Sequence, residues 1–331
     1  MDLDALRAAR EPEWNRLDAL AADSRLDGRK ADELIGRYQD AAADLSTVTT
    51  TAGATVLADR LAVSLSRARM RFTGAGANLL SLLPRFFVLE LPAALYRVRW
   101  WTFWAALVSA VVAVVYGAWA AGDPHVLAAI GDDADLKRLV NHDFVDYYSA
   151  NPAASFTGQV WTNNAWIAAQ CIAFGILGLY APYILLQNAS HVGITGGVMV
   201  AYGRADTFFL YIAPHGLLEL TSVFVAAAAG MRIFWAWIAP GARTRGQALA
   251  EDGRALFTIA IGLTLSLFVS GCIEGFVTPS PLPWPVKIGI GALALAAFLV
   301  YMLVVGRRAA RAGETGDLSE FSAGARRLVA A

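Results

Sequence analysis

The sequence predicts an all-α, polytopic membrane protein with five to six membrane passages, preceded by a small helical bundle. Of its 331 residues 57% are apolar, and the mean hydropathy is +0.48. Soluble domains are only about 45–50% apolar. A helix needs about 20 apolar residues to span a bilayer, and five runs of roughly this length are present. They are residues 102–121, 166–186, 208–230, 256–277 and 286–306.

Basic residues orient the predicted spans, because arginine and lysine accumulate on the cytoplasmic side of membrane proteins. Residues 1–101 carry 14 of the 27 basic residues in the chain. The segment 122–165 carries two basic residues against six aspartates, whereas 231–254 and the tail after Gly306 are basic again. We therefore expect both termini and the segment 231–254 in the cytoplasm, and the segment 122–165 outside.

This orientation requires a sixth passage. The second span ends in the cytoplasm near Gln187, and residues 231–254 are cytoplasmic too, so an even number of crossings lies between them. The run 208–230 supplies one crossing, and the short apolar run 189–202 is expected to supply the other. The alternatives are a re-entrant turn around Pro214, or five spans with one misassigned loop.

Three glycines predict that the short passage is a broken helix. They are Gly193, Gly196 and Gly197. Glycine weakens a helix interior by about 1 kcal/mol relative to alanine, and irregular backbone at membrane depth survives only where protein or water shields it. The break is therefore expected beside the run 208–230. Gly193 and Gly197 also form a G-x-x-x-G pair, so close packing of helices is an equal alternative.

Outside the spans, the chain divides into segments of different character. Residues 1–80 place apolar side chains at helical spacing and predict a small cytoplasmic bundle without a catalytic motif. Residues 81–101 mix aromatic residues with arginines, as an amphipathic helix on the inner leaflet does. The membrane domain follows at 102–306, and its outer loop 122–165 is long enough to fold. The cytoplasmic tail 307–331 is small and polar, which predicts disorder.

Three ionisable residues lie within the apolar runs. His215 and Glu219 are four residues apart and so share one helix face, and Glu274 lies in a later run. An ionisable side chain in hydrocarbon costs roughly 2.5–3.5 kcal/mol on insertion scales, so such residues usually face a bundle interior and carry a function. We predict that these three residues form a buried, functional polar cluster.

Four further residues are candidates for lining a groove or interrupting a helix. Asn163 and Asn164 stand at the mouth of a predicted span, where they either line a groove or cap a helix start. Pro214 and Gly216 flank the histidine, and proline removes a helical hydrogen bond. The sequence therefore places polar and helix-weakening residues close to the ionisable ones.

An ordered set of short motifs resembles the stage II sporulation protein M family of bacterial membrane proteins. The motifs are Trp161-Thr162-Asn163-Asn164, Gly196-Gly197, Pro214-His215-Gly216 with Glu219, and Glu274 ahead of Thr278-Pro279. The resemblance covers about residues 80–310. It implies an integral inner-membrane protein without an established catalytic activity. The namesake of the family serves in forespore engulfment, as a membrane scaffold for a peptidoglycan hydrolase and a second anchored protein.

The first functional hypothesis is a non-catalytic integral membrane scaffold of a cell-envelope complex. In this hypothesis the polar cluster joins membrane helices through hydrogen bonds worth about 1 kcal/mol each. The second hypothesis is a proton-coupled transporter, or a flippase for an envelope lipid. It would use Glu219 and Glu274 as proton carriers beside broken helices.

A third hypothesis is an intramembrane metal-dependent hydrolase. His215, Glu219 and Glu274, with His191 as a further candidate, are of the types that bind zinc. The sequence lacks the His-Glu-x-x-His motif that such enzymes commonly carry. We therefore expect no catalytic residue, no metal and no cofactor.

The expected partners are membrane lipids and an envelope protein, such as a peptidoglycan-remodelling enzyme. A second copy of the chain, in a homo-oligomer, is an option that the sequence leaves open. Nucleic acid is not expected, because the basic residues flank the spans and do not gather on a soluble face. The expected location is the bacterial inner membrane, with several passages and with both termini cytoplasmic.

Overall fold

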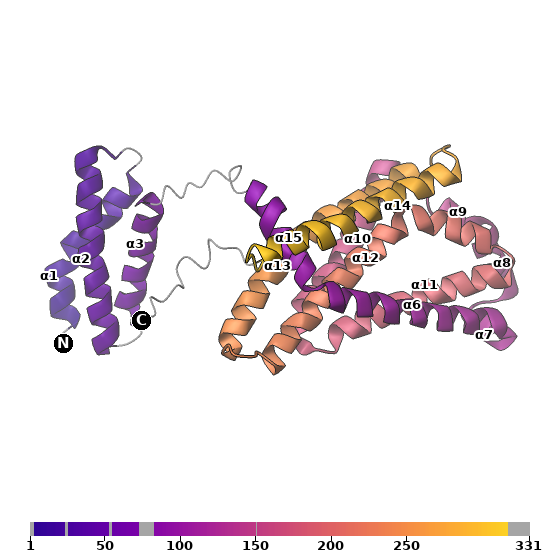
Figure 1. Cartoon of the computed structure of the whole chain (residues 1–331), viewed down its shortest axis with the longest axis horizontal. Helices are drawn as coiled ribbons and strands as arrows, with labels where there is room; N and C mark the ends of the chain where they lie inside the picture. The colour runs from indigo at the N-terminus through magenta and orange to yellow at the C-terminus, as the bar shows by residue number, and fades with distance from the viewer. Residues whose placement is uncertain (1–2, 24–25, 53–54, 73–82, 150, 317–331) are drawn as a thin grey trace. The chain divides into compact units, whose positions relative to one another are not determined.

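The computed structural model describes residues 3–23, 26–52, 55–72, 83–149 and 151–316 (Figure 1). All regular secondary structure within these ranges is helical, and five of the described helices are long and apolar enough to cross a membrane. The prediction of an all-α, polytopic membrane protein is therefore confirmed.

The chain forms two compact units, Met1–Leu83 and Pro84–Ala331. The first unit is a bundle of three helices, α1 (Leu3–Ala22), α2 (Gly28–Ala52) and α3 (Val56–Phe72). All three helices contribute to one apolar core, in which Trp14, Leu34 and Leu61 are almost fully buried. The predicted helical bundle at the start of the chain is confirmed.

The described residues of the second unit include six long helices. They are α6 (Arg99–Gly122), α10 (Ala153–Ala173), α11 (Tyr180–Ala201), α12 (Ala205–Ile238), α13 (Arg245–Cys272) and α14 (Trp284–Val300). Helices α6 and α11 lie side by side in Figure 1. Helix α12 packs against α6, α10, α11, α13 and α14, and is therefore the central helix of this unit.

Short helical elements connect or extend the six long helices. They are η1 (Phe86–Glu90), α5 (Leu91–Arg97), α7 (Pro124–Ile130), α8 (Asp133–Arg138), η2 (Leu139–Asp143), α9 (Phe144–Asp146), η3 (Gly175–Leu177), η4 (Ile273–Val277), η5 (Tyr301–Val305) and α15 (Gly306–Arg311). The elements α7 to α9 fold the predicted outer loop. An amphipathic helical segment packs its apolar residues Leu136 and Val140 against Met199 and Phe208 of the long helices.

The connections between the long helices alternate between two ends of the unit. The turns 174–179 and 239–244 lie at one end, where Trp101 packs against Trp235 with ring centroids 6.2 Å apart. The turn 202–204 lies at the other end beside α8 and η2. Following the predicted orientation, we name the first the inner end and the second the outer end.

The predicted boundaries of the second span and of the short passage are wrong. A turn at 174–179 divides the predicted span 166–186, and the run 189–202 is only the second half of α11. Gly178 adopts a φ of +76° in this turn, a conformation that glycine alone reaches without strain. Hydropathy did not reveal the turn because its residues are nearly all apolar.

The predicted helix break at the three glycines is also wrong, since α11 continues through all of them. A Cβ atom at Gly193 would collide with the carbonyl oxygen of Ala113 in α6, and one at Gly197 would collide with that of Gly117. A Cβ at Gly196 would meet the ring of Phe208 at 3.1 Å. The structure therefore supports the alternative reading of the G-x-x-x-G pair, close packing of two helices.

Helix α12 likewise continues through Pro214 and Gly216, so the re-entrant alternative is wrong. A Cβ at Gly291 of α14 would collide with the carbonyl oxygen of Pro214. The proline turn of α12 is therefore in close contact with a neighbouring helix.

The segment predicted as an interfacial helix, 81–101, is described from Leu83 onward. Its central residues Leu91–Leu95 are buried within the second unit, where α5 packs against α13 and α15. This segment therefore contributes to the core of the unit. Its position relative to a membrane surface stays a prediction.

The first part of the predicted tail, residues 307–316, is described and begins within α15, and residues 317–331 lie outside the described residues. Glu314 pairs with Arg85 at 3.2 Å, and the carbonyl oxygen of Gly316 accepts a hydrogen bond from the hydroxyl of Thr258 at 3.0 Å. These polar contacts hold the first part of the tail against the inner end.

We predict that Gly197→Ala destabilises the second unit. The added methyl group would overlap backbone of α6, and overpacking of this kind costs about 1–3 kcal/mol. Thermal unfolding of the detergent-solubilised protein would show a lower melting temperature. Gly289→Ala in α14 is the matched control, because a Cβ there meets no atom within 4 Å. Equal melting temperatures of the two variants would contradict the packing role of Gly197.

Candidate functional site

The structure brings the three predicted ionisable residues together near the outer end. His215 and Glu219 lie one turn apart on α12, and Glu274 lies in the π-helical turn η4 that ends α13. Nε2 of His215 is 3.8 Å from Oε1 of Glu274. One potential ligand atom from each residue lies within 4.8 Å of the other two. We call these three residues the outer cluster.

The outer cluster is buried and incompletely hydrogen-bonded. His215 and Glu274 are each only 4% exposed. Within the described part of the chain, Nδ1 of His215 and Oε2 of both glutamates have no hydrogen-bond partner. Buried polar groups without a partner are rare in folded proteins and call for an explanation.

The two predicted asparagines differ in their position. Asn164 and Ser270 are polar neighbours of the Glu219 carboxylate, and the Ser270 hydroxyl also donates to the carbonyl oxygen of His215 at 3.1 Å. Asn163 is exposed on another face of α10. His191, weighed as a further ligand, is also exposed and lies outside the outer cluster.

Aromatic residues from the end of the outer loop cover the outer cluster. The ring of Tyr148 lies 5.8 Å from that of His215 and 5.2 Å from that of Tyr211. Tyr147 packs against Phe156 at the start of α10. Burial, together with the nearby carboxylate of Glu274, raises the pKa of Tyr148, so its phenol stays protonated.

Sequence reasoning missed a buried lysine beside the outer end. Lys287 is 4% exposed, and its Nζ donates to the carbonyl oxygen of Thr278 at 2.6 Å. The same nitrogen lies 4.0 Å from the ring centroid of Trp284, which is a cation–π arrangement. The one feature of the sequence that could have indicated this residue is the presence of a single lysine at the start of an apolar run. The contact joins α14 to the residues that follow η4.

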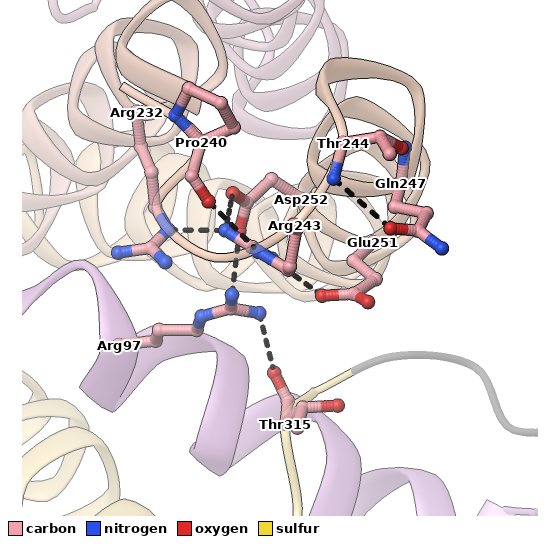
Figure 2. Close-up of polar contacts among 9 residues, drawn as sticks. All are labelled: Arg97, Arg232, Pro240, Arg243, Thr244, Gln247, Glu251, Asp252 and Thr315. Carbon is pink, nitrogen blue, oxygen red and sulfur yellow. Dashed lines mark hydrogen bonds and ion pairs between the residues drawn. The ribbon is translucent and has the colours of Figure 1, made fainter. Parts of the chain in front are cut away.

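A second polar cluster lies at the inner end, and sequence reasoning missed it (Figure 2). The carboxylate of Asp252, with 2% of its side chain exposed, forms an ion pair with Arg97 at 2.9 Å and accepts a hydrogen bond from Arg232 at 3.1 Å. Arg243 lies 3.6 Å from its second oxygen and pairs with Glu251 as well. We call these five residues the inner cluster.

The inner cluster joins four parts of the chain. Arg97 ends α5, Arg232 lies on α12, Arg243 lies in the following turn and Asp252 lies on α13. Arg97 also donates to the carbonyl oxygen of Thr315 in the tail (Figure 2). Burial, and then the neighbouring positive charge of Arg232, lowers the pKa of Arg97. Basic residues on which the predicted orientation rests thus also have a structural role at the inner end.

Comparison with known proteins places most of the second unit in one family. Residues 106–279 match the family model described as Stage II sporulation protein M. Residues 4–74, within the three-helix bundle, match a model described as Domain of unknown function (DUF8413). No curated protein and no solved structure matches the chain. The first match contains all three residues of the outer cluster and covers about half of the chain.

We predict that Asp252→Asn destabilises the protein by about 3 kcal/mol, because it leaves three arginines without their carboxylate. This is the lower end of the range for breaking a buried ion pair, since the arginine side chains are 23–32% exposed and reach solvent.

The control is Glu251→Gln. Glu251 pairs with Arg243 but is 41% exposed, so its loss should cost less than about 1 kcal/mol. Thermal unfolding in detergent measures both effects. An Asp252→Asn variant no less stable than Glu251→Gln would show that the inner cluster does not hold the helices together.

Proposed function

Because the chain belongs to the stage II sporulation protein M family, we propose that it is a non-catalytic membrane scaffold of a cell-envelope complex. We place it in the bacterial inner membrane with both termini in the cytoplasm. The observation that carries the proposal is the arrangement of its buried charged groups. They lie where helices meet and join those helices to one another, as a rigid platform requires.

The inner cluster supports this proposal. A single buried carboxylate, Asp252, contacts three arginines from separate parts of the chain. Since removing one partner of such a network leaves buried charge uncompensated, the network favours one arrangement of α5, α12 and α13. A single fixed arrangement of helices suits a scaffold better than it suits a protein whose helices must move between two conformations.

The outer loop offers a folded surface for an envelope partner. Tyr202 donates to Asp133 at 3.0 Å, and Arg204 donates to Asn141 at 2.6 Å, which fixes α8 and η2 to the turn 202–204. These contacts add to the apolar packing beneath the loop. A peptidoglycan-remodelling enzyme is the kind of partner we propose for this surface, because peptidoglycan lies on the outer side of the inner membrane.

Two helices present apolar faces to their surroundings. Only 17% of the most apolar part of α6 is buried, and only 11% of that of the continuous helix Trp284–Arg311, which begins with α14. Exposed residues on these helices include Trp104, Val114 and Leu293. Membrane lipids cover such surfaces by default, and an apolar groove of about 350 Å³ between Leu91, Leu265 and Phe298 suits an acyl chain. A second copy of the chain could pack on the same faces.

A specific observation also favours transport as a second candidate function. Two carboxylates, each with an oxygen that lacks a partner, lie close to each other and to the outer end. A proton-coupled transporter or a lipid flippase would use such groups as proton carriers. On this account Glu219 and Glu274 would change protonation during each cycle.

We predict that cross-linking in native membranes captures an enzyme that cleaves peptidoglycan, identified by mass spectrometry, in stoichiometric amount. Glu219→Gln and Glu274→Gln should reduce recovery of this enzyme at least about fivefold. This corresponds to a loss of about 1 kcal/mol in the free energy of binding between the two proteins. Glu90→Gln is the control, since Glu90 is also buried but pairs with Arg85 away from the outer cluster. Wild-type protein recovered without a protein partner would argue against the scaffold and favour transport.

We predict six passages with the outer loop on the external side. In a background with Cys171 and Cys272 replaced by alanine, a membrane-impermeant maleimide should label His142→Cys in intact spheroplasts. It should label Leu179→Cys and Ala242→Cys only after lysis, because both turns lie at the inner end. Labelling of Leu179→Cys before lysis would show that α10 does not cross the membrane. Labelling of Leu179→Cys and Ala242→Cys before lysis, with His142→Cys labelled only after lysis, would contradict the orientation.

A further inference from the structure

We propose that His215, Glu219 and Glu274 bind one divalent transition-metal ion of the zinc class. The sequence alone favoured a cluster without metal, and the arrangement of the side chains changes that expectation. The inference does not depend on the scaffold role, because an ion at this place can brace helices in a scaffold or in a transporter.

The backbone presents the three side chains to a common point. Positions 215 and 219 are one turn apart on α12, so both side chains leave the same face. The third comes from η4, a π-helical turn, and such turns occur frequently at functional sites. The ligand atoms lie within 4.8 Å of one another, so a shared zinc ion at about 2.0–2.2 Å from each would draw the three side chains closer together.

The unpaired atoms provide an independent argument. His215 is nine-tenths or more buried and directs Nε2 towards Glu274 at 3.8 Å, and Oε2 of each glutamate lacks a partner. A metal ion accepts electron pairs from such atoms and so replaces the missing hydrogen-bond donors. Two carboxylates and one dication together carry no net charge, which removes most of the cost of placing charge in a poorly solvated site.

The donor set selects the class of ion. One imidazole nitrogen with two carboxylate oxygens suits zinc and its neighbours in the first transition series, whereas calcium and magnesium prefer oxygen ligands alone. Asn164 and Ser270, both beside Glu219, are positioned to orient its carboxylate as a second layer of contacts. Three protein ligands leave a fourth position of a tetrahedron open to water.

The proposed ion would join α12 to the end of α13. The inner cluster already joins these helices through Arg232 and Asp252, and the metal would make the corresponding connection at the opposite end. Tyr148, which packs over His215, would limit exchange of the ion with solvent. We therefore expect slow release of the ion to a chelator.

The direct test is elemental analysis of untagged, full-length protein purified in detergent without chelator. We expect about one zinc, or another first-row divalent ion, for each chain, since this is the stoichiometry of a single three-ligand site. His215→Gln and Glu274→Gln should each reduce the content at least about fivefold. Glu90→Gln, a buried carboxylate that pairs with Arg85, should leave it unchanged.

A second measurement needs no variant. Removal of the ion from wild-type protein should lower the melting temperature by roughly 5 °C, and addition of zinc should restore it. Cobalt in place of zinc should give visible absorption bands that Glu274→Gln abolishes. Purified wild-type protein that contains no divalent ion and neither binds cobalt nor responds to zinc would overturn the proposal. Equal metal content in wild type and all variants would overturn it too.

Discussion

The cost of placing charged side chains between membrane helices governs this structure. Within a bilayer, charged side chains cannot form hydrogen bonds with water, so each needs a partner inside the protein. At the inner end Asp252 meets this requirement with three arginines, and these basic residues also set the predicted orientation of the chain. At the outer end His215, Glu219 and Glu274 are brought together but leave three atoms without a partner. Both clusters depend on α12, which supplies Arg232 to one and two residues to the other.

Close helix packing is the second condition, since apolar surfaces alone do not drive helices together in lipid. Glycines lie where backbones approach most closely. Gly193 and Gly197 pack against α6, and Gly230 packs against Gly175 in the turn between α10 and α11. Gly291 brings α14 against the proline turn of α12, just before His215. Gly193 and Gly197, which the sequence predicted as a helix break, therefore serve the close packing of α6 and α11.

The sequence predicted what local spacing and hydropathy control. The four-residue interval placed His215 and Glu219 on one face, and the scarcity of charge in the later run singled out Glu274. The sequence did not indicate that Asp252 is buried, because neighbouring residues in the stretch are charged too. Whether the Asp252 carboxylate is buried depends on which arginines contact it in the folded protein. The turn at 174–179 was not predicted because its residues are as apolar as the helices it joins, so the hydropathy of the sequence does not mark the end of α10 or the start of α11. Tertiary contacts decided those features, and they also decided that the glycines of α11 pack helices and do not break one.

The two clusters differ in whether their buried polar atoms find partners within the described part of the chain. The carboxylate of the inner cluster has its partners within the chain, so that cluster can stabilise the fold without any external group. The outer cluster has three buried atoms that no described residue satisfies, although their burial is nearly as complete. A buried polar contact with a purely structural role is more stable when all of its atoms have partners, or when apolar residues of similar volume replace it. The unpaired atoms at the outer end therefore support the ion proposed there, beside the folded outer loop.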